Sequence, residues 1–194
     1  MCRREGVSLC GREKCALKRR QNPPGQHGDA KKRSKMSGYG LQLREKQKAK
    51  RLYNVMERQF RRYFDEARSK KGNTSEVLIR ILELRLDNVV YRLGFGKTRR
   101  QARQMVSHGF FAVNGKNVNI PSYSVKVGEE ISIKESKRNK KMVDGLVEQL
   151  SKNTAPKWLH VTSGELKGKI VSLPEGEDLK SVFDPTLIVE LYSR

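Results

Sequence analysis

The stretch Thr98-Arg-Arg-Gln-Ala-Arg-Gln-Met-Val-Ser-His-Gly-Phe-Phe-Ala-Val-Asn-Gly-Lys-Asn-Val118 contains two structural periods in succession. Its first part places apolar residues at a helical spacing, namely Ala102, Met105 and Val106. Thr98 and Gln101 form a capping box before this helix, because the hydroxyl accepts from one free amide and Gln101 reaches back to another. After Gly109 the pattern alternates around Asn114-Gly115, the strongest short-range signal for a hairpin. The stretch therefore predicts a short helix followed directly by a β-hairpin.

Upstream of this stretch the sequence predicts helices. Residues 37–40 interrupt any helix, and a Lys/Arg-rich helical segment follows from Leu41. A second helix is predicted from about 57 to 69, with its aromatic residues on the inward face: Phe60, Tyr63 and Phe64. Thr74 or Ser75 is suited to cap a third helix, and apolar periodicity continues over 84–95.

Downstream, strands predominate until the end of the chain. Strands are predicted at 110–113, 116–120, 123–127 and 130–133, and within 158–172; helices are predicted at 137–150 and at 184–194, the latter started by Asp184 and Pro185. The fold class is therefore α+β. We expect a basic N-terminal arm over 1–40, an α-helical domain formed by 41–87 plus 171–194, and an inserted module over 88–170. That module would contain two short helices and a small antiparallel sheet.

The charge of the chain is its strongest compositional signal. Among 194 residues, 42 Lys and Arg face 21 Asp and Glu, a formal net charge of +21. The net charge falls from +12 over 1–51 to +7 over 52–105 and +2 over 106–194. Such charge opposes compaction unless an anionic partner neutralises it, which favours nucleic acid. No apolar run is long enough for a transmembrane helix, and no apolar segment follows the first residues as in a secretory signal.

The predicted helix at 99–107 carries a candidate binding face. Arg99 and Arg103 are four residues apart and share one side, and Arg100 lies at the first turn. The hairpin adds Asn114 and Lys116 beside them. Guanidinium groups near a helix N-terminus can bind phosphate, so the sequence predicts that this face contacts the phosphodiester backbone and recognises the shape of folded RNA. The alternative is a solvated basic helix without a partner.

Several motifs resemble the family of bacterial-type small-subunit ribosomal protein S4. They are the segments 85–94 (RLDNVVYRLG), 99–103 (RRQAR), 108–109, 113–115 (VNG), 23–28 (PPGQHG), 43–47 (LREKQ), 57–61 (ERQFR) and 190–194 (ELYSR). The resemblance implies a primary binder of small-subunit ribosomal RNA that nucleates assembly of the subunit body. It also implies a cytoplasmic place near the messenger-RNA entry channel, beside ribosomal proteins three and five, and a contribution to translation accuracy.

The expected RNA contacts follow from charge and from this resemblance. They comprise Arg3, Arg4, Lys31, Lys32, Arg33, Lys35, Arg44, Lys46, Lys50, Arg51, Arg58, Arg61, Arg62, Lys97, Thr98, Arg99, Arg100, Arg103, Gln104, His108, Asn114 and Lys116. No membrane partner is expected.

Two other functions compete with this interpretation of the sequence: an enzyme and a nonspecific polyanion binder. Arg85-Leu86-Asp87 reproduces part of a pseudouridine synthase motif, but the sequence continues Asn-Val-Val rather than with the Thr-Ser-Gly type of that family. Asp87 is interpreted instead as a helix-surface or salt-bridging carboxylate. The segment 94–96 is not a strand-to-helix phosphate loop, and the three histidines are scattered, so no catalytic role is predicted. A DNA-packaging or heparin-binding protein would share the charge but not the ordered module.

Three cysteines in the arm are candidate metal ligands. Cys2, Cys10 and Cys15 lie in a segment that lacks the apolar periodicity for a core, and thiolates in a reducing compartment suggest zinc. Some members of the resembled family bind zinc through four cysteines, of which these three resemble the second, third and fourth. The first would lie before Met1; otherwise His27 or water completes the shell, or the metal is lost. We expect the arm to be disordered or loosely folded without RNA.

Overall fold

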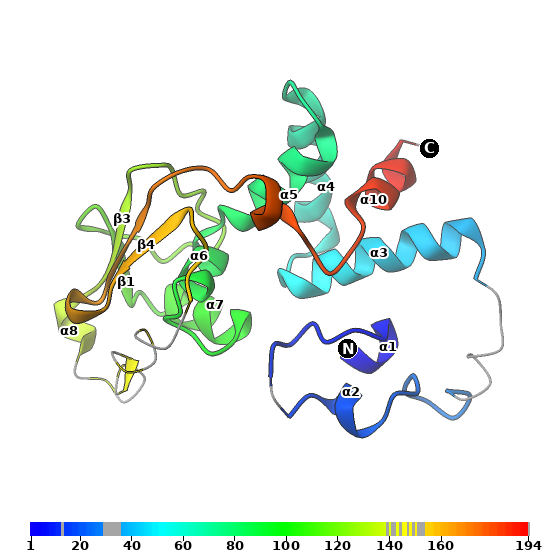
Figure 1. Cartoon of the computed structure of the whole chain (residues 1–194), viewed down its shortest axis with the longest axis horizontal. Helices are drawn as coiled ribbons and strands as arrows, with labels where there is room; N and C mark the ends of the chain where they lie inside the picture. Colours follow the sequence, from blue (N-terminus) through cyan, green and yellow to red (C-terminus); the bar gives the residue numbers. More distant parts are fainter. Residues whose placement is uncertain are drawn as a thin grey trace. The chain divides into compact units, whose positions relative to one another are not determined.

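A computed structural model gives the fold of the chain (Figure 1). It describes residues 1–12, 14–28, 36–138, 140, 143, 145–146, 148, 150 and 154–193. The described residues form two compact units, 1–79 with 180–194 and 80–179. The first unit is therefore built from two separate segments of the chain, whereas the second is continuous.

The first unit is helical. It contains α1 (Cys2–Glu5), α2 (Ala16–Arg19), α3 (Gly38–Leu52), α4 (Glu57–Ser69), most of α5 (Thr74–Glu83) and α10 (Pro185–Tyr192). The helix at Glu57–Ser69 is confirmed with its predicted bounds, and its aromatic face is buried. The predicted interruption at 37–40 is wrong, because the Ser37 hydroxyl accepts from the Gly40 amide at 3.2 Å and starts α3 there.

The α10 helix packs on α3, and its aromatic residue reaches α4. The Asp184 carboxylate accepts from the Thr186 amide at 2.8 Å and Pro185 follows, as predicted. The Tyr192 ring lies 4.7 Å from that of Phe64, between centroids, and Gln42 donates to Glu190 at 2.9 Å. The α5 helix is capped by Asn73, whose side chain accepts from the Ser75 amide, so the predicted caps at Thr74 or Ser75 are wrong.

The second unit pairs two helices with an antiparallel sheet. The helices are α6 (Leu86–Arg92) and α7 (Arg99–Ser107); the strands are β1 (Phe111–Val113), β2 (Lys116–Asn117), β3 (Glu130–Ile133), β4 (Leu159–Thr162) and β5 (Lys167–Ile170). Their order is β2-β1-β3-β5-β4, and every pairing is antiparallel. The described part of the unit also contains the end of α5 and the short helices α8 (Glu135–Arg138), η2 (Ser163–Glu165) and η3 (Gly176–Leu179). The α+β class is thus confirmed.

One core joins these helices to the sheet. Leu93, Phe95, Met105, Phe111, Ile131 and Ile170 are almost completely buried within it. Gly168 allows a close approach, since a Cβ there would lie 2.6 Å from a methyl carbon of Leu93, the C-cap residue of α6. The α6 helix therefore packs directly on the backbone of β5.

The segment at 123–127 is not the predicted strand. Only Ser124 forms a bridge, with Arg85. The backbone of this segment instead binds the start of α6: the carbonyl of Tyr123 accepts from the Leu86 amide at 2.8 Å, and the Val125 amide donates to Leu84. The backbone groups that would pair in a strand are thus used to hold a helix terminus. Of the predicted helix at 137–150, residues 139, 141, 142, 144, 147 and 149 lie outside the described residues.

Candidate nucleic-acid interface

Two features fix the orientation of α7: a hydrogen-bonded cap at its N-terminus and a buried apolar side. Its N-terminus is closed by the predicted capping box: the Gln101 amide donates to the Thr98 hydroxyl at 3.2 Å, and Gln101 accepts from the Lys97 amide at 2.9 Å. Ala102, Met105 and Val106 are fully buried against the core. Because the apolar side is fixed, the opposite side must face outward.

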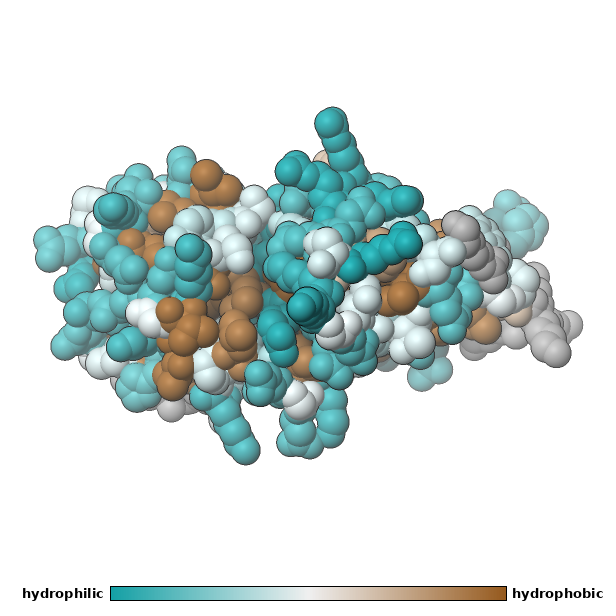
Figure 2. Space-filling view, turned by 90° about the horizontal axis from the view of Figure 1, so that it is seen from above, coloured by the Kyte–Doolittle hydropathy of each residue, from teal (hydrophilic) through white to brown (hydrophobic). Residues whose placement is uncertain are grey.

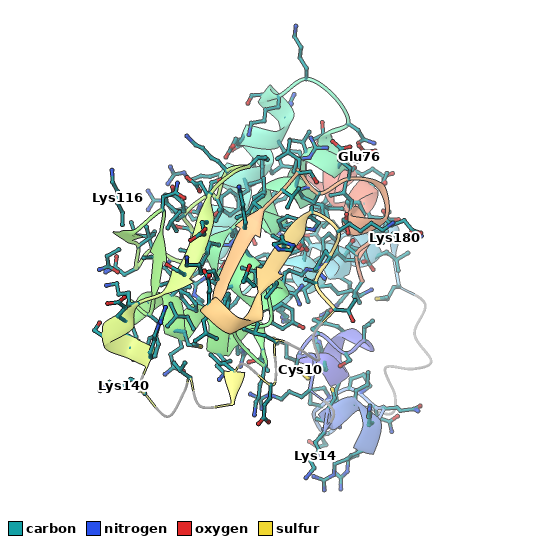
Figure 3. The ribbon with its side chains drawn as sticks, turned by 60° about the vertical axis from the view of Figure 1, so that its left-hand side comes forward. Cys10, Lys14, Glu76, Lys116, Lys140 and Lys180 are labelled. Atoms are coloured by element: carbon teal, nitrogen blue, oxygen red, sulfur yellow. The ribbon has the colours of Figure 1, made fainter. Side chains whose placement is uncertain are left out.

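That outward side forms a basic and polar surface with the hairpin. Lys97, Arg100, Gln104 and His108 are exposed on or beside α7, and Asn114 and Lys116 are exposed on the hairpin. We call these six residues, together with Arg99 and Arg103, the α7–hairpin surface. Asn114 and Gly115 have φ values of 47° and 78°, which gives the turn twist that a two-residue hairpin needs. Figure 3 shows the Lys116 side chain pointing away from the sheet.

Arg99 and Arg103 are half-buried and engaged rather than simply directed outward. Arg103 Nη1 donates to Asp87 Oδ2 at 3.0 Å. Arg99 Nε donates to Asn88 Oδ1 at 2.8 Å, and its guanidinium lies 4.4 Å from the centroid of the Tyr91 ring. The sequence predicted that both guanidinium groups point outward, but Asp87 and Asn88 of α6 also accept hydrogen bonds from them. The two guanidinium groups are held in place by α6.

A buried polar layer, which was not predicted from the sequence, lies under this surface. The Glu83 carboxylate accepts hydrogen bonds from Nε and Nη2 of Arg92, at 2.9 and 2.8 Å, and from the side-chain amide of Asn88 at 2.8 Å. Asp87 was interpreted as either a helix-surface or a salt-bridging carboxylate; the structure supports the second, because the residue is only 4% exposed and pairs with Arg85. The one available signal was the density of paired charges over 83–92.

The α4 helix of the first unit presents a second basic surface. Arg58, Arg61 and Arg62 are exposed on it, opposite the buried aromatic residues. Arg61 lies 3.6 Å from Asp65, one turn further along. An exposed pair of this kind holds its partners weakly, so the three guanidinium groups stay accessible to a polyanion.

The predicted contacts on α3 are paired inside the first unit. Lys46 and Lys50 donate to the Glu57 carboxylate at 2.9 and 2.6 Å, while Arg44 and Arg51 bind Glu5. All four basic side chains are only partly exposed. They contribute to the fold as well as to the local positive charge.

Glu57 gathers several donors. Burial opposes its ionisation, but hydrogen bonds from Lys50, Tyr192 and Lys46 outweigh that cost and lower the pKa of Glu57 from 4.5 to about 2. The Tyr192 hydroxyl donates to it at 2.7 Å; burial and this hydrogen bond raise the pKa of Tyr192. Glu57 therefore remains ionised at neutral pH and ties α3, α4 and α10 together.

The arm contributes a cavity of about 430 Å³ lined by Arg3, Arg20, Gln21, Asn22, Pro23, Gly25 and Gly28. Arg3 Nε donates to the Asn22 carbonyl at 2.9 Å, which folds the turn at 21–28 back onto α1. Arg4 is half-buried in α1. The remaining predicted contacts of the arm, Lys31, Lys32, Arg33 and Lys35, lie outside the described residues.

The three cysteines converge. The sulfur atoms of Cys2, Cys10 and Cys15 all lie within 4.8 Å of one another, and among the described residues this group does not include His27. Hydrogen bonds from the Ser8 side chain and the Leu17 amide lower the pKa of Cys15 to about 7, whereas burial raises that of Cys2. A thiol that ionises near neutral pH is suited to metal binding.

Hydrophilic side chains cover much of the visible face of the molecule (Figure 2), in keeping with a mean hydropathy of −0.75. No helix in the described part of the chain combines the length and apolar character needed to cross a membrane. The capped basic helix α7 and the hairpin that follows it lie within residues 84–131, which the S4 domain model matches, so this part of the chain is an S4 domain.

Comparison with known proteins identifies the family. The model for the ribosomal protein S4/S9 N-terminal domain matches residues 1–83. Small ribosomal subunit protein uS4 of Acetivibrio thermocellus is 52% identical over all of this chain and 95% of its own length, and that of Thermodesulfovibrio yellowstonii is 50% identical with the same coverage. The uS4 protein of Chloroflexus aurantiacus is 50% identical over 99% of this chain and 94% of its own. The chain belongs to the uS4 family.

Proposed function

We propose that this chain is a non-enzymatic constituent of the small ribosomal subunit that binds its ribosomal RNA in the cytoplasm. Full-length similarity to proteins named small ribosomal subunit protein uS4 supports the assignment. The observation that carries the mechanism is the α7–hairpin surface, in which a buried apolar side fixes the direction of the basic side. The family resemblance extends the proposal to assembly of the subunit body and to accuracy near the messenger-RNA entry channel, beside protein five.

The binding mechanism is phosphate recognition. The α7–hairpin surface offers arginine forks, two lysines and polar side chains, and the exposed arginines of α4 form a second anchoring surface. Each cation that meets a phosphate releases condensed counterions, so affinity depends steeply on salt. The exposed polar residues Gln104, His108 and Asn114 are suited to contacts with sugars and unpaired bases.

Binding to small-subunit ribosomal RNA at increasing salt tests this proposal. If the chain neutralises six to ten phosphates, its affinity should fall by about 10³–10⁵ between 50 and 200 mM salt. The affinity for this RNA should also exceed that for duplex DNA of the same length. A nearly flat salt dependence, or equal binding to DNA, would contradict the proposal.

A triple variant separates the α7–hairpin surface from general charge. Replacing Arg99, Arg100 and Arg103 by Ala should weaken RNA binding by several kcal/mol, at about 1–3 kcal/mol for each lost charge-assisted contact. The matched control replaces three exposed lysines of the same unit, Lys126, Lys157 and Lys169, with the same change in charge. Equal losses in the two variants would mean that only the net charge matters.

We also propose that the cysteine group binds zinc. Three thiols whose sulfur atoms lie within 4.8 Å supply three of the four ligands that structural zinc prefers. Bound zinc would crosslink α1 to the turn before α2 and stabilise the arm. Elemental analysis of the purified protein should give one zinc per chain, lost in a Cys10→Ser variant. Two results together would contradict this assignment: the purified wild-type protein contains no zinc, and adding zinc does not change the rate at which the amide hydrogens of the arm exchange.

A further inference from the structure

We infer that Asp87 is a positioning residue for RNA binding: it orients the Arg103 guanidinium toward the phosphate backbone from beneath the α7–hairpin surface. The inference rests on the proposed function. It assigns to an acidic side chain, which by its charge alone should repel RNA, a role that strengthens binding.

Asp87 is held rigidly in the first turn of α6. Its amide donates to the Pro121 carbonyl at 3.2 Å, and its side chain is only 5% exposed. Both carboxylate oxygens accept from the buried Arg85, with Nε at 3.1 Å and Nη2 at 2.8 Å. This bidentate pair fixes the plane of the carboxylate, so the direction of its remaining acceptor position is fixed as well.

Arg103 takes that remaining position. Its Nη1 donates to Oδ2 at 3.0 Å, so the guanidinium is held from the inside, while the side chain as a whole is 36% exposed. The backbone of Arg103 is fixed independently, because its neighbours Ala102 and Met105 are fully buried. An arginine held at both ends loses less side-chain entropy when it binds phosphate than one that is free to rotate.

Arg85 has a separate part in this arrangement. It is itself 3% exposed, so it is too buried to meet RNA, and it balances the charge that Asp87 brings into the interior. The trio thus has a net positive charge, and the partly exposed member of it is Arg103.

The sign of a single substitution distinguishes positioning from charge. Asp87→Asn raises the net charge by one, and electrostatics alone therefore predicts tighter RNA binding and a steeper salt dependence. Positioning predicts the opposite, a loss of about three- to tenfold, because the ordering of Arg103 is then paid at binding. Glu135→Gln is the matched control, since it adds the same charge at an exposed position of the same unit.

The experiment measures small-subunit ribosomal RNA binding in the four chains of a double-mutant cycle, namely wild type, Asp87→Asn, Arg103→Ala and the double variant, and in the control Glu135→Gln. We expect Asp87→Asn to weaken binding in the wild-type background and to have no further effect when Arg103 is Ala. Glu135→Gln should bind as tightly as wild type or tighter. Wild-type chain that fails to bind this RNA would refute the proposed function, whereas binding by wild type with unchanged or tighter binding by Asp87→Asn would refute only this inference.

A purely structural role of Asp87 has a different signature. If its loss merely loosens the second unit, binding weakens equally with Arg103 and with Ala at position 103, and that result would overturn the inference. Urea denaturation identifies the folded fraction of each variant, and Asp87→Glu repeats the cycle with the charge retained for Arg85. Nitrogen-15 NMR of the unmodified protein gives an independent measurement: Arg103 should show restricted guanidinium rotation compared with the exposed Arg62, and equal averaging of the two would refute the positioning.

Discussion

Replacing Glu5 by Gln should release the N-terminal arm from α3 without unfolding the first unit. The Glu5 side chain is completely buried, and both Arg44 and Arg51 bind its Oε1 atom. The other oxygen, Oε2, is buried without a hydrogen-bond partner in the described structure. These contacts join a four-residue helix to the longest helix of the unit, and Gln removes the charge while it keeps the shape.

The magnitude follows from how exposed the partners are. Removing one partner of a fully buried ion pair costs about 3–5 kcal/mol, because it leaves an uncompensated charge in the interior. Here the side chains of Arg44 and Arg51 are 27% and 34% exposed, so water compensates part of that charge. Gln also retains one acceptor. We therefore expect a cost of about 1–2 kcal/mol, a factor of about 5–30 in the docking equilibrium of the arm.

Hydrogen exchange measures this effect locally. The amides of Arg4 and Lys18 donate within the arm, to Met1 and Cys15, and they should exchange about 5–30 times faster in Glu5→Gln than in wild type. Amides of α3 and α4 should be unaffected. Glu66→Gln is the control, since it breaks an exposed pair with Lys70 and should leave the arm unchanged. Equal exchange of the arm in wild type and Glu5→Gln would refute the docking role of Glu5.

Three further predictions concern stability. Gly168→Ala should destabilise the second unit by about 1–3 kcal/mol in urea denaturation, and combining it with Leu93→Ala should cost less than the two single changes added, because the new methyl fills part of the cavity. The pKa of Glu57 is lowered from 4.5 to about 2, so its contribution to the free energy of unfolding is complete above pH 4.5 and lost as the pH falls through 2. Because the Glu57 side chain is half-exposed, this contribution should be about 1 kcal/mol. It is measured by comparing the acid unfolding of wild type with that of Glu57→Gln. Asn114→Ala should cost about 1 kcal/mol by thermal unfolding, because Asn114 has a positive φ and accepts from the Glu130 amide at 2.9 Å.

The α7–hairpin stretch could be predicted from the sequence because its signals are local. A capping box, an apolar triplet and an Asn-Gly turn each act within a few residues, and the structure confirms all three. The hairpin strands were predicted too long, since β2 covers only Lys116–Asn117.

The polar layer and the ion pairs of α3 could not be predicted in the same way. Asp87 meets Arg103 across 16 residues, and Glu5 meets Arg51 across 46, so no local period indicates either pair. The segment at 123–127 has the alternation of a strand, but its backbone bonds Leu84, just before α6, and Leu86, the first residue of α6. In each case a distant backbone or side-chain group decides the outcome, and one sequence alone does not show which distant groups meet.

The division of the first unit into two segments has a consequence for its synthesis. A chain emerges from its N-terminus, so residues 1–79 are made well before 180–194, and 80–179 are made between them. The partners of Phe64 on α4 and of Gln42 on α3, Tyr192 and Glu190, are therefore synthesised last. The second unit is one continuous segment, so all its residues are synthesised earlier. We expect the order of folding to be the reverse of the order in which the units begin.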